Sequence, residues 1–168
     1  NGQPAVQFFN SISGNMSTGL FTTALYQPNT VLMVVRGPTM TTSARYAFDG
    51  ITTIGTQALR ANSSYDLLLR SGADITVYNG TTNILTYLAV IQVVFNGNHS
   101  NLWRNGTQLG SDGIAGGLDM NGFTLGSSAT SVSFANMEVC EVLIFNRKLS
   151  TTELASFNTY ATARYALT

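Results

Sequence analysis

The segment from Phe134 to Leu167 constrains the fold more than any other part of the sequence. An apolar run from Val139 to Phe145 has the length of a strand, and it is followed closely by Ser150-Thr151-Thr152-Glu153. Glu153 stands three places after Ser150, which is the spacing of a capping box. In that motif the serine hydroxyl accepts the N3 backbone N–H, and the glutamate carboxylate accepts the serine N–H. The sequence therefore predicts a long strand leading into one short C-terminal helix that starts near Thr151.

The rest of the chain reads as short strands separated by turns. Asn-Gly pairs at positions 79, 96, 105 and 121 are strong hairpin signals, and no helical pattern competes before Thr151. The strand-like segments are Ala5–Phe9, Thr30–Arg36, Arg45–Asp49, Tyr65–Arg70, Ala73–Tyr78, Leu85–Asn96, Asn101–Arg104, Thr107–Leu109, Phe123–Gly126 and Phe134–Phe145. The pattern predicts an all-β fold, an antiparallel β-sandwich of the jelly-roll type. Its core is expected to include Val31, Met33, Val35, Val90, Val94, Val142 and Ile144.

Composition excludes several functional classes. Charged residues make up 10% of the 168 and their formal charges cancel, whereas about 25% is usual. Without a basic patch, nucleic-acid binding is disfavoured. The longest apolar run, Leu85 to Phe95, is too short to span a bilayer, so we expect no membrane insertion. Cys140 is the single cysteine, and its place in an apolar strand predicts a buried thiol.

No repeat or linker divides the chain, so residues 1–168 are expected to form one domain. The sequence starts at Asn1 without a methionine or a signal peptide. We therefore interpret it as a piece excised from a longer chain and lacking a first segment.

Several phrases resemble one family. They are Glu141-Val142-Leu143-Ile144-Phe145-Asn146, Arg164-Tyr165-Ala166-Leu167, Leu125-Gly126-Ser127, Asn1–Phe8, and the hairpin-like stretch Val93–Gly106. Together they resemble the laminin-G-like branch of the concanavalin A-like lectin/glucanase superfamily, in its bacterial or phage form. An aspartate and a glycine often follow the first phenylalanine in those members, whereas Phe9 and Asn10 stand there in this chain. The resemblance implies a concanavalin A-like sandwich that binds sugars or surface ligands, and in some members cleaves glycans.

The acidic residues argue against catalysis. Glycoside hydrolysis needs two carboxyl groups that face one sugar. The nearest pair in sequence, Glu138 and Glu141, is offset by three, which in a regular strand places the two side chains on opposite faces. His99 is the single histidine and lies in a polar turn. A Ser–His–Asp site would have to be built around this one residue, and a zinc site would need several ligands that the chain lacks. We therefore expect no enzymatic activity.

No cofactor is expected, with calcium as the one candidate left open. The resemblance implies that a calcium ion could sit at the edge of the sandwich, as in many laminin-G-like domains. Asp112 and Asp119 lie in the loop from Gly110 to Asn121 and could supply oxygen ligands.

Sugar recognition needs an aromatic face together with planar polar groups. Three turn-borne groups offer these chemistries: Trp103 with Arg104 and Asn105 first, Tyr78 with Asn79 second, and Arg60 with Asn62 and Tyr65 third. A lone strand tryptophan is also often a core residue, and that alternative stays open for Trp103.

These observations predict a non-catalytic, lectin-like binding or adhesion module that recognises glycan on a cell or virion surface. The alternative is a structural virion domain, such as a phage capsid decoration or tail fibre head, that acts through protein contacts. A glycoside hydrolase ranks last. The expected partners are a glycan or a surface protein, with copies of the same chain in a larger assembly as a further option. The expected location is extracellular, on a cell surface or on a virion.

Overall fold

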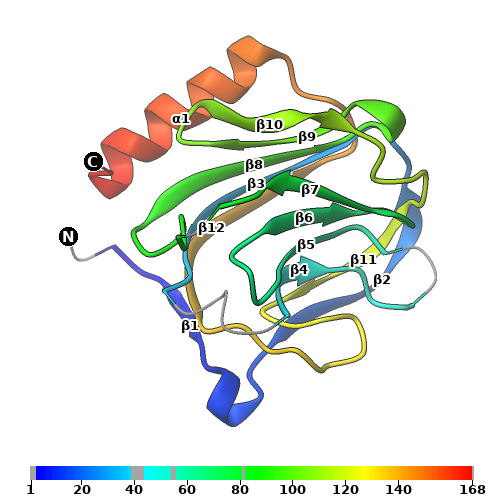
Figure 1. Cartoon of the computed structure of the whole chain (residues 1–168), viewed down its shortest axis with the longest axis horizontal. Helices are drawn as coiled ribbons and strands as arrows, with labels where there is room; N and C mark the ends of the chain where they lie inside the picture. Colours follow the sequence, from blue (N-terminus) through cyan, green and yellow to red (C-terminus); the bar gives the residue numbers. More distant parts are fainter. Residues whose placement is uncertain (1–2, 39–43, 54–55, 81, 168) are drawn as a thin grey trace.

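Two antiparallel sheets of six strands each pack face to face in the described part of the chain (Figure 1). The structure is a computed structural model that describes residues 3–38, 44–53, 56–80 and 82–167. Sheet A has the order β1 (Val6–Phe8), β12 (Met137–Phe145), β3 (Asn29–Arg36), β8 (Ala89–Phe95), β9 (Ser100–Arg104) and β10 (Thr107–Gly113). Sheet B has the order β2 (Met16–Leu25), β11 (Met120–Leu125), β4 (Arg45–Asp49), β5 (Ala58–Ala61), β6 (Leu67–Arg70) and β7 (Asp74–Tyr78). The predicted all-β sandwich is confirmed.

The strands expected from the sequence are present, and two further strands complete sheet B. Strand β2 is ten residues long and mostly exposed, and β5 has only four residues. Two 3-10 turns, Asn10–Ile12 and Gly97–His99, complete the connections. No helix in the described residues is long and apolar enough to cross a membrane.

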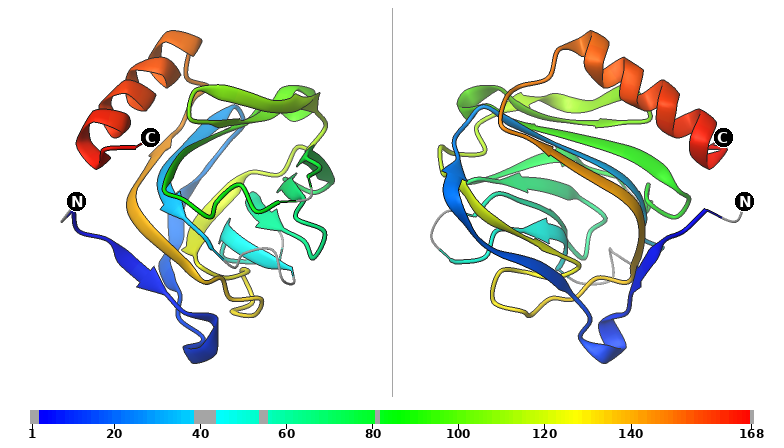
Figure 2. Two further views of the ribbon diagram at one scale, coloured as in Figure 1. Left: turned by 60° about the vertical axis from the view of Figure 1, so that its left-hand side comes forward. Right: turned by 180° about the vertical axis from the view of Figure 1, so that it is seen from behind.

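The C-terminal helix α1 runs from Thr151 to Tyr165, as the capping box predicts. Ser150 Oγ accepts the Glu153 N–H at 3.3 Å, and Glu153 Oε2 accepts the Ser150 N–H at 2.9 Å. Arg147 adds an ion pair with Glu153 at 2.7 Å. These contacts stabilise the ionised carboxylate, with the arginine as the largest cause, and lower the pKa of Glu153 to about 2. The helix lies across the outer face of sheet A (Figure 2).

Sheet A therefore separates two apolar cores. Val31, Met33 and Val35 face sheet B in the core of the sandwich, as expected, and Val142 and Ile144 are half-buried against that core. Val90 and Val94 are buried as well, but they belong to a second core between sheet A and α1. The helix-side members of that core are Leu149, Leu154, Phe157, Ala161 and Tyr165.

A bulge in β12 changes the placement of the acid pair. The register against β3 shifts between Val139 and Glu141, so Glu138, Cys140 and Glu141 all lie on the helix side of sheet A. The expectation that Glu138 and Glu141 face opposite sides was therefore wrong, because a bulge inserts one residue into the alternation. The two carboxylates have separate partners: Glu138 pairs with Arg36, and Glu141 accepts the hydroxyls of Tyr165 at 2.9 Å and Tyr160 at 3.2 Å.

Cys140 is half-buried rather than buried as expected, because it faces the helix side of sheet A and lines a hollow there. Partial burial and the neighbouring carboxylates of Glu138 and Glu141 raise the pKa of its thiol. The thiol is therefore held in its protonated, weakly nucleophilic form at neutral pH.

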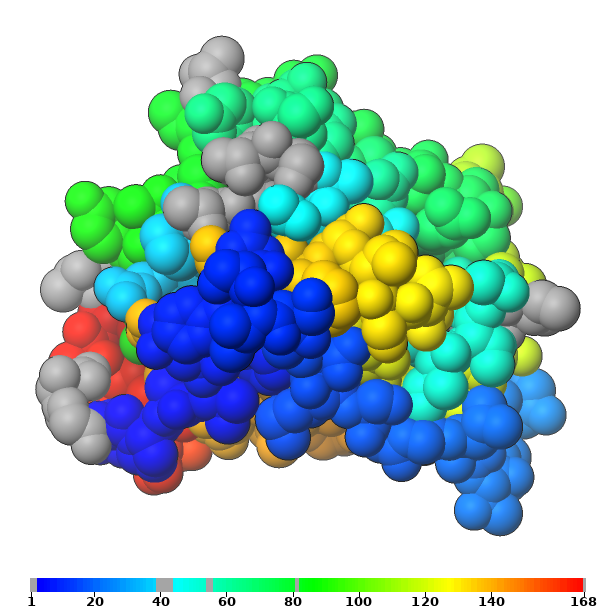
Figure 3. Space-filling view, turned by 90° about the horizontal axis from the view of Figure 1, so that it is seen from below, coloured from blue at the N-terminus to red at the C-terminus, as the bar shows by residue number. Residues whose placement is uncertain are grey.

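The N-terminal segment packs along one end of the sandwich. Figure 3 shows this segment (blue) beside the connection between β11 and β12 (yellow). Asn10 donates its backbone N–H to Asn136 Oδ1 at 2.7 Å, and Asn15 Nδ2 donates to Ser127 Oγ at 3.0 Å. At the other end of this segment, Gln3 and Ala5 line a hollow of about 510 Å³ together with Ala166 and Leu167. The two described ends of the chain thus lie on the same side of the molecule (Figure 1).

Candidate ligand-binding site

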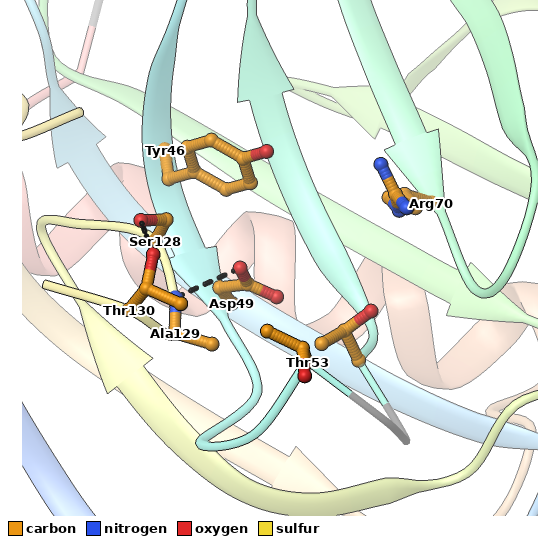
Figure 4. A pocket seen from close by; sticks show the side chains of 8 residues that line it. Tyr46, Asp49, Thr53, Arg70, Ser128, Ala129 and Thr130 are labelled. Carbon is orange, nitrogen blue, oxygen red and sulfur yellow. Dashed lines mark hydrogen bonds between the residues drawn. The ribbon is translucent and has the colours of Figure 1, made fainter. Parts of the chain in front are cut away.

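A hollow of about 190 Å³ opens on the outer face of sheet B (Figure 4). We call it the sheet B hollow. It is lined by Tyr46, Asp49, Thr53, Thr56, Arg70, Ser128, Ala129 and Thr130. These residues come from β4, the β4–β5 connection, the end of β6 and the β11–β12 connection, so strand pairing across the sheet brings them together.

Register places Tyr46 and Arg70 on the outer face. Leu59 and Leu69 are buried in the sandwich core, and Arg60 and Arg70 follow each of them by one residue, so both arginines point outward. Tyr46 stands opposite Arg60 in the β4–β5 ladder and shares that face. Burial raises the pKa of the Tyr46 phenol, which keeps the hydroxyl protonated and able to donate at neutral pH.

Asp49 joins two walls of the hollow. Its side chain is 5% exposed, Oδ1 accepts the Gly50 N–H at 2.8 Å, and Oδ2 accepts the Ala129 N–H at 2.9 Å (Figure 4). Burial raises the pKa of this carboxyl, while the two N–H donors and the nearby arginines oppose the shift. Asp49 therefore fixes the β11–β12 connection against the end of β4.

The two arginines beside the hollow, Arg60 and Arg70, differ in how closely they approach Asp74. Arg60 forms a 2.7 Å ion pair with Asp74 Oδ2, whereas Arg70 Nη1 lies 4.0 Å from the same oxygen. The side chain of Arg70 is 44% exposed. Its guanidinium therefore has donors to spare for a ligand, in a geometry suited to two adjacent oxygens.

The far wall is a tight turn that presents hydroxyl groups. Ser128 Oγ donates to Val132 O at 2.8 Å and lies 3.3 Å from Thr130 Oγ1 (Figure 4). An aromatic ring, a guanidinium and threonine hydroxyls thus meet around one hollow. This arrangement is suited to a polar ring compound with several hydroxyls, because one face can contact Tyr46 while the edge is hydrogen-bonded.

Strand β9 places Trp103 and Arg104, two residues of the first expected ligand-binding group, on opposite faces of sheet A. Trp103 lies on the helix side of β9, where it packs against the second core and donates Nε1–H to Asn101 Oδ1 at 3.1 Å. Arg104 lies on the opposite side and donates Nε–H to Ile84 O at 2.9 Å. Asn105 occupies the β9–β10 turn with φ of 48°, and its Oδ1 accepts the Val90 N–H at 2.8 Å. The structure therefore brings Trp103 and Asn105 together and separates Arg104 from them.

The other expected groups are distributed along sheet B. The Tyr78 hydroxyl is 3.5 Å from Thr82 O, and Asn79 follows it as an exposed residue. Tyr65 is exposed in the β5–β6 turn with φ of 67°. Arg60 lies next to the sheet B hollow through its contact with Tyr46, but it is engaged with Asp74.

The described residues offer no cluster for a metal ion. No group of three or more His, Cys, Asp or Glu side chains is placed to hold one in this part of the chain. Asp112 Oδ1 instead accepts Asn101 Nδ2 at 3.1 Å and Gln108 Nε2 at 2.8 Å. The first bond joins β9 to β10 and the second lies within β10, so Asp112 has a role within the hairpin.

Sequence reasoning missed Tyr46, Asp49, Arg70 and the Ser128–Thr130 turn. The available signal was weak: Asp49 begins an Asp-Gly turn, and Arg70 ends a strand. The grouping itself depends on β6 and β11 lying on either side of β4 and β5 in one sheet, which the sequence does not reveal.

Comparison with known proteins supports the fold. No family model matches the chain, and no curated protein matches it. Solved structures do match. The HCR/D W1238A mutant superposes with a TM-score of 0.73 and 12% identity, over 98% of this chain and 44% of that one. The K499G mutant of NanB sialidase from Streptococcus pneumoniae gives 0.64 and 12%, over 90% and 27%. Trypanosoma rangeli sialidase gives 0.61 and 14%, over 80% and 22%.

The chain spans less than half the length of each of these proteins. At such low identity the likeness shows the sandwich fold alone. That fold is compatible with the concanavalin A-like expectation, while the laminin-G-like branch has no matching family model.

Proposed function

We propose that this chain is a non-catalytic glycan-binding module of an extracellular, cell-surface or virion protein, and that the sheet B hollow is its principal site. The convergence of Tyr46, the accessible Arg70 guanidinium and the hydroxyls of the β11–β12 turn around one hollow carries the proposal. The sandwich fold shared with parts of two sialidases supports it.

The dimensions suit one sugar residue. The hollow, about 190 Å³, is smaller than the pockets of about 300–1,000 Å³ that enclose drug-sized ligands. A terminal sugar would therefore be held on one face and at its edge, with the remainder of the glycan in solvent. Affinity of this kind is weak for one site, so adhesion would depend on several copies acting together.

The acid content of the hollow supports binding without cleavage. Asp49 is the one carboxyl among its described lining residues, and both of its oxygens accept backbone N–H groups. Most glycosidase families place two carboxyl groups on either side of the scissile bond. A second acid in the right place is missing from this part of the lining.

The test is a glycan array probed with the purified chain displayed on multivalent beads, followed by Arg70→Gln. Removing the guanidinium should weaken binding to the selected glycan by at least about tenfold, because hydrogen bonds to charged groups contribute about 1.5–3 kcal/mol. Lys148→Gln is the control, since it removes one positive charge from an exposed position in the β12–α1 connection that does not line the hollow.

Equal binding by parent and Arg70→Gln would assign recognition to another surface, and an array without any bound glycan would refute the proposal. Incubation of the bound glycan with the chain should release no reducing sugar. Release that Asp49→Asn abolishes would show an enzyme instead.

A second candidate function, a structural role through protein contacts, is favoured by one observation. An apolar opening of about 280 Å³ lies between the sheets beside edge strand β2, lined mainly by Met16, Phe123, Leu125, Val142 and Ile144. The exposed edge strand carries no charged residue. Light scattering over a range of concentrations, with Leu20→Lys as the disrupting variant, tests whether this edge forms contacts between chains.

A further inference from the structure

A second cavity lies between helix α1 and the outer face of sheet A, which is the face turned away from sheet B. Figure 2 shows the helix lying across this face. We call the cavity the helix crevice. It has a volume of about 360 Å³ and is lined by Gln92, Trp103, Asn105, Gly106, Thr151, Leu154, Ala155, Asn158 and Thr159. None of these described lining residues carries a charge.

Gln92 is a buried polar residue at the floor of this crevice. It lies on β8 opposite Trp103 and has 0% exposure. Its Nε2 donates to Leu154 O of α1 at 2.6 Å, and no described residue donates to its Oε1. The orientation of the amide is settled by chemistry, because the Leu154 carbonyl can only face a donor. A buried acceptor without a partner is costly, so a ligand hydroxyl that reached this oxygen would relieve that cost.

Asn158 repeats this feature on the helix side. Its Oδ1 is buried and has no partner among the described residues. Its Nδ2 lies close to the β9–β10 turn, where a Cβ added at Gly106 would be 3.3 Å away. Gly106 has φ of 80°, so the turn requires a residue that tolerates this conformation and also leaves room for the amide.

Trp103 and Asn105 complete the lining from the sheet. The indole is held in place by its bond to Asn101 and is only partly buried. Asn105 Oδ1 is occupied by the Val90 N–H, so Nδ2 is the group of this amide that can donate to a ligand. The crevice therefore combines an aromatic face, two acceptors that need donors, and amide donors.

These features select one chemical class. An anion or cation would meet no opposite charge among the described lining residues, and a purely apolar ligand would leave the oxygens of Gln92 and Asn158 without donors. A neutral pyranose has an apolar face for an indole and hydroxyl groups around its edge that both donate and accept. We propose that the helix crevice is a second binding site, which takes an uncharged monosaccharide unit stacked on Trp103.

This inference does not depend on the sheet B hollow, because the two sites share no residue. Trp103 is the only tryptophan in the chain. Its fluorescence and its single indole N–H signal in a 15N-edited NMR spectrum therefore report on this site directly.

The experiment titrates the chain with neutral hexoses and N-acetylhexosamines up to about 100 mM, which is about a hundredfold above a 1 mM Kd. At least one sugar should shift the indole N–H signal and change the fluorescence in a saturable way. Glucuronate and free sialic acid at the same concentrations serve as charged comparisons and should not do so. A titration in which none of the neutral sugars moves the indole signal overturns the proposal.

Two alanines of α1 provide a matched pair of blocking variants. Ala155 lines the crevice, whereas Ala163 is exposed two turns further along the helix and does not. Ala155→Phe should weaken the saturable response by at least about tenfold, while Ala163→Phe should leave it within about twofold of the parent. Equal responses from both variants would overturn the assignment.

Arg70→Gln should leave this response unchanged and reduce only binding to the sheet B hollow. Failure of one site can therefore be told from failure of the other. Loss of the indole response in Arg70→Gln would place the sugar at the sheet B hollow and overturn the separate site.

Discussion

Replacing Gln92 with methionine should stabilise the chain, although it removes a buried hydrogen bond. The lost bond from Nε2 to Leu154 O costs about 0.5–1.5 kcal/mol. The Leu154 carbonyl keeps a hydrogen-bond partner within α1, because the helix continues past residue 158, whose backbone N–H is the i+4 donor to it. The substitution also removes Oε1, a buried acceptor without a partner among the described residues, which relieves about 1–3 kcal/mol. Methionine has a similar size, and its flexible side chain fills irregular space.

The balance is a gain of about 1 kcal/mol in the free energy of unfolding, or about 2–4 °C in Tm for a chain of this length. Urea unfolding followed by circular dichroism measures it as a higher midpoint with an unchanged slope. The same substitution should abolish the response of Trp103 to sugar, since it removes an acceptor from the helix crevice. A Gln92→Met variant that is more stable but no longer binds sugar would show that the Gln92 amide serves the ligand rather than the fold.

Gln57→Met is the matched control. Gln57 is equally buried, its Nε2 donates to Leu118 O at 2.9 Å, and its Oε1 also has no partner among the described residues. It lines neither site, so it should stabilise the chain similarly and leave binding unchanged. If Gln92→Met lowers the midpoint while Gln57→Met raises it, the oxygen of Gln92 is satisfied in the free protein and the reasoning fails.

Three further predictions concern α1. Ser150→Ala removes the acceptor of the Glu153 N–H and should cost about 1 kcal/mol in urea unfolding; no change would show that the cap is dispensable. Because the folded-state pKa of Glu153 is about 2 against an ordinary 4.5, its contribution is complete above about pH 4.5 and is lost as the pH falls toward 2. Glu153→Gln should therefore flatten the pH dependence of stability between about pH 4.5 and 2. An unchanged loss of stability in this pH range would contradict the prediction. Tyr165→Phe should cost about 1 kcal/mol through its bond to Glu141, and Tyr160→Phe, at a more exposed hydroxyl, should cost less. A reversed order in melting experiments would refute the assignment.

The sequence predicted the elements whose signals are local. The capping box needs only Ser150 and Glu153, and the apolar β3 and β8 stand out by composition. Strand β2 was missed because it is an exposed edge strand whose alternation is interrupted at Gly19, with φ of 74°. Strand β5 was missed because four residues carry too little pattern.

The site was less predictable because it depends on faces and on distant pairings. Period-two alternation alone separates Arg104 from Trp103 and Asn105, so that division was available from the sequence. The shared face of Glu138 and Glu141 was not, because a bulge has no sequence signature of its own here. The sheet B hollow unites residues as far apart as Tyr46 and Ser128, and only the strand order of the sheet places them together.

The proximity of the two described ends has a consequence for how the fold can be rewired. Gln3 and Leu167 line one hollow, so a short flexible linker should join them without disturbing either core. New termini could then be opened between the exposed Ser63 and Ser64 in the β5–β6 turn, which would yield a circular permutant with the same sheets. The same arrangement would let the sandwich be inserted into a surface loop of a carrier protein, entering and leaving at neighbouring points.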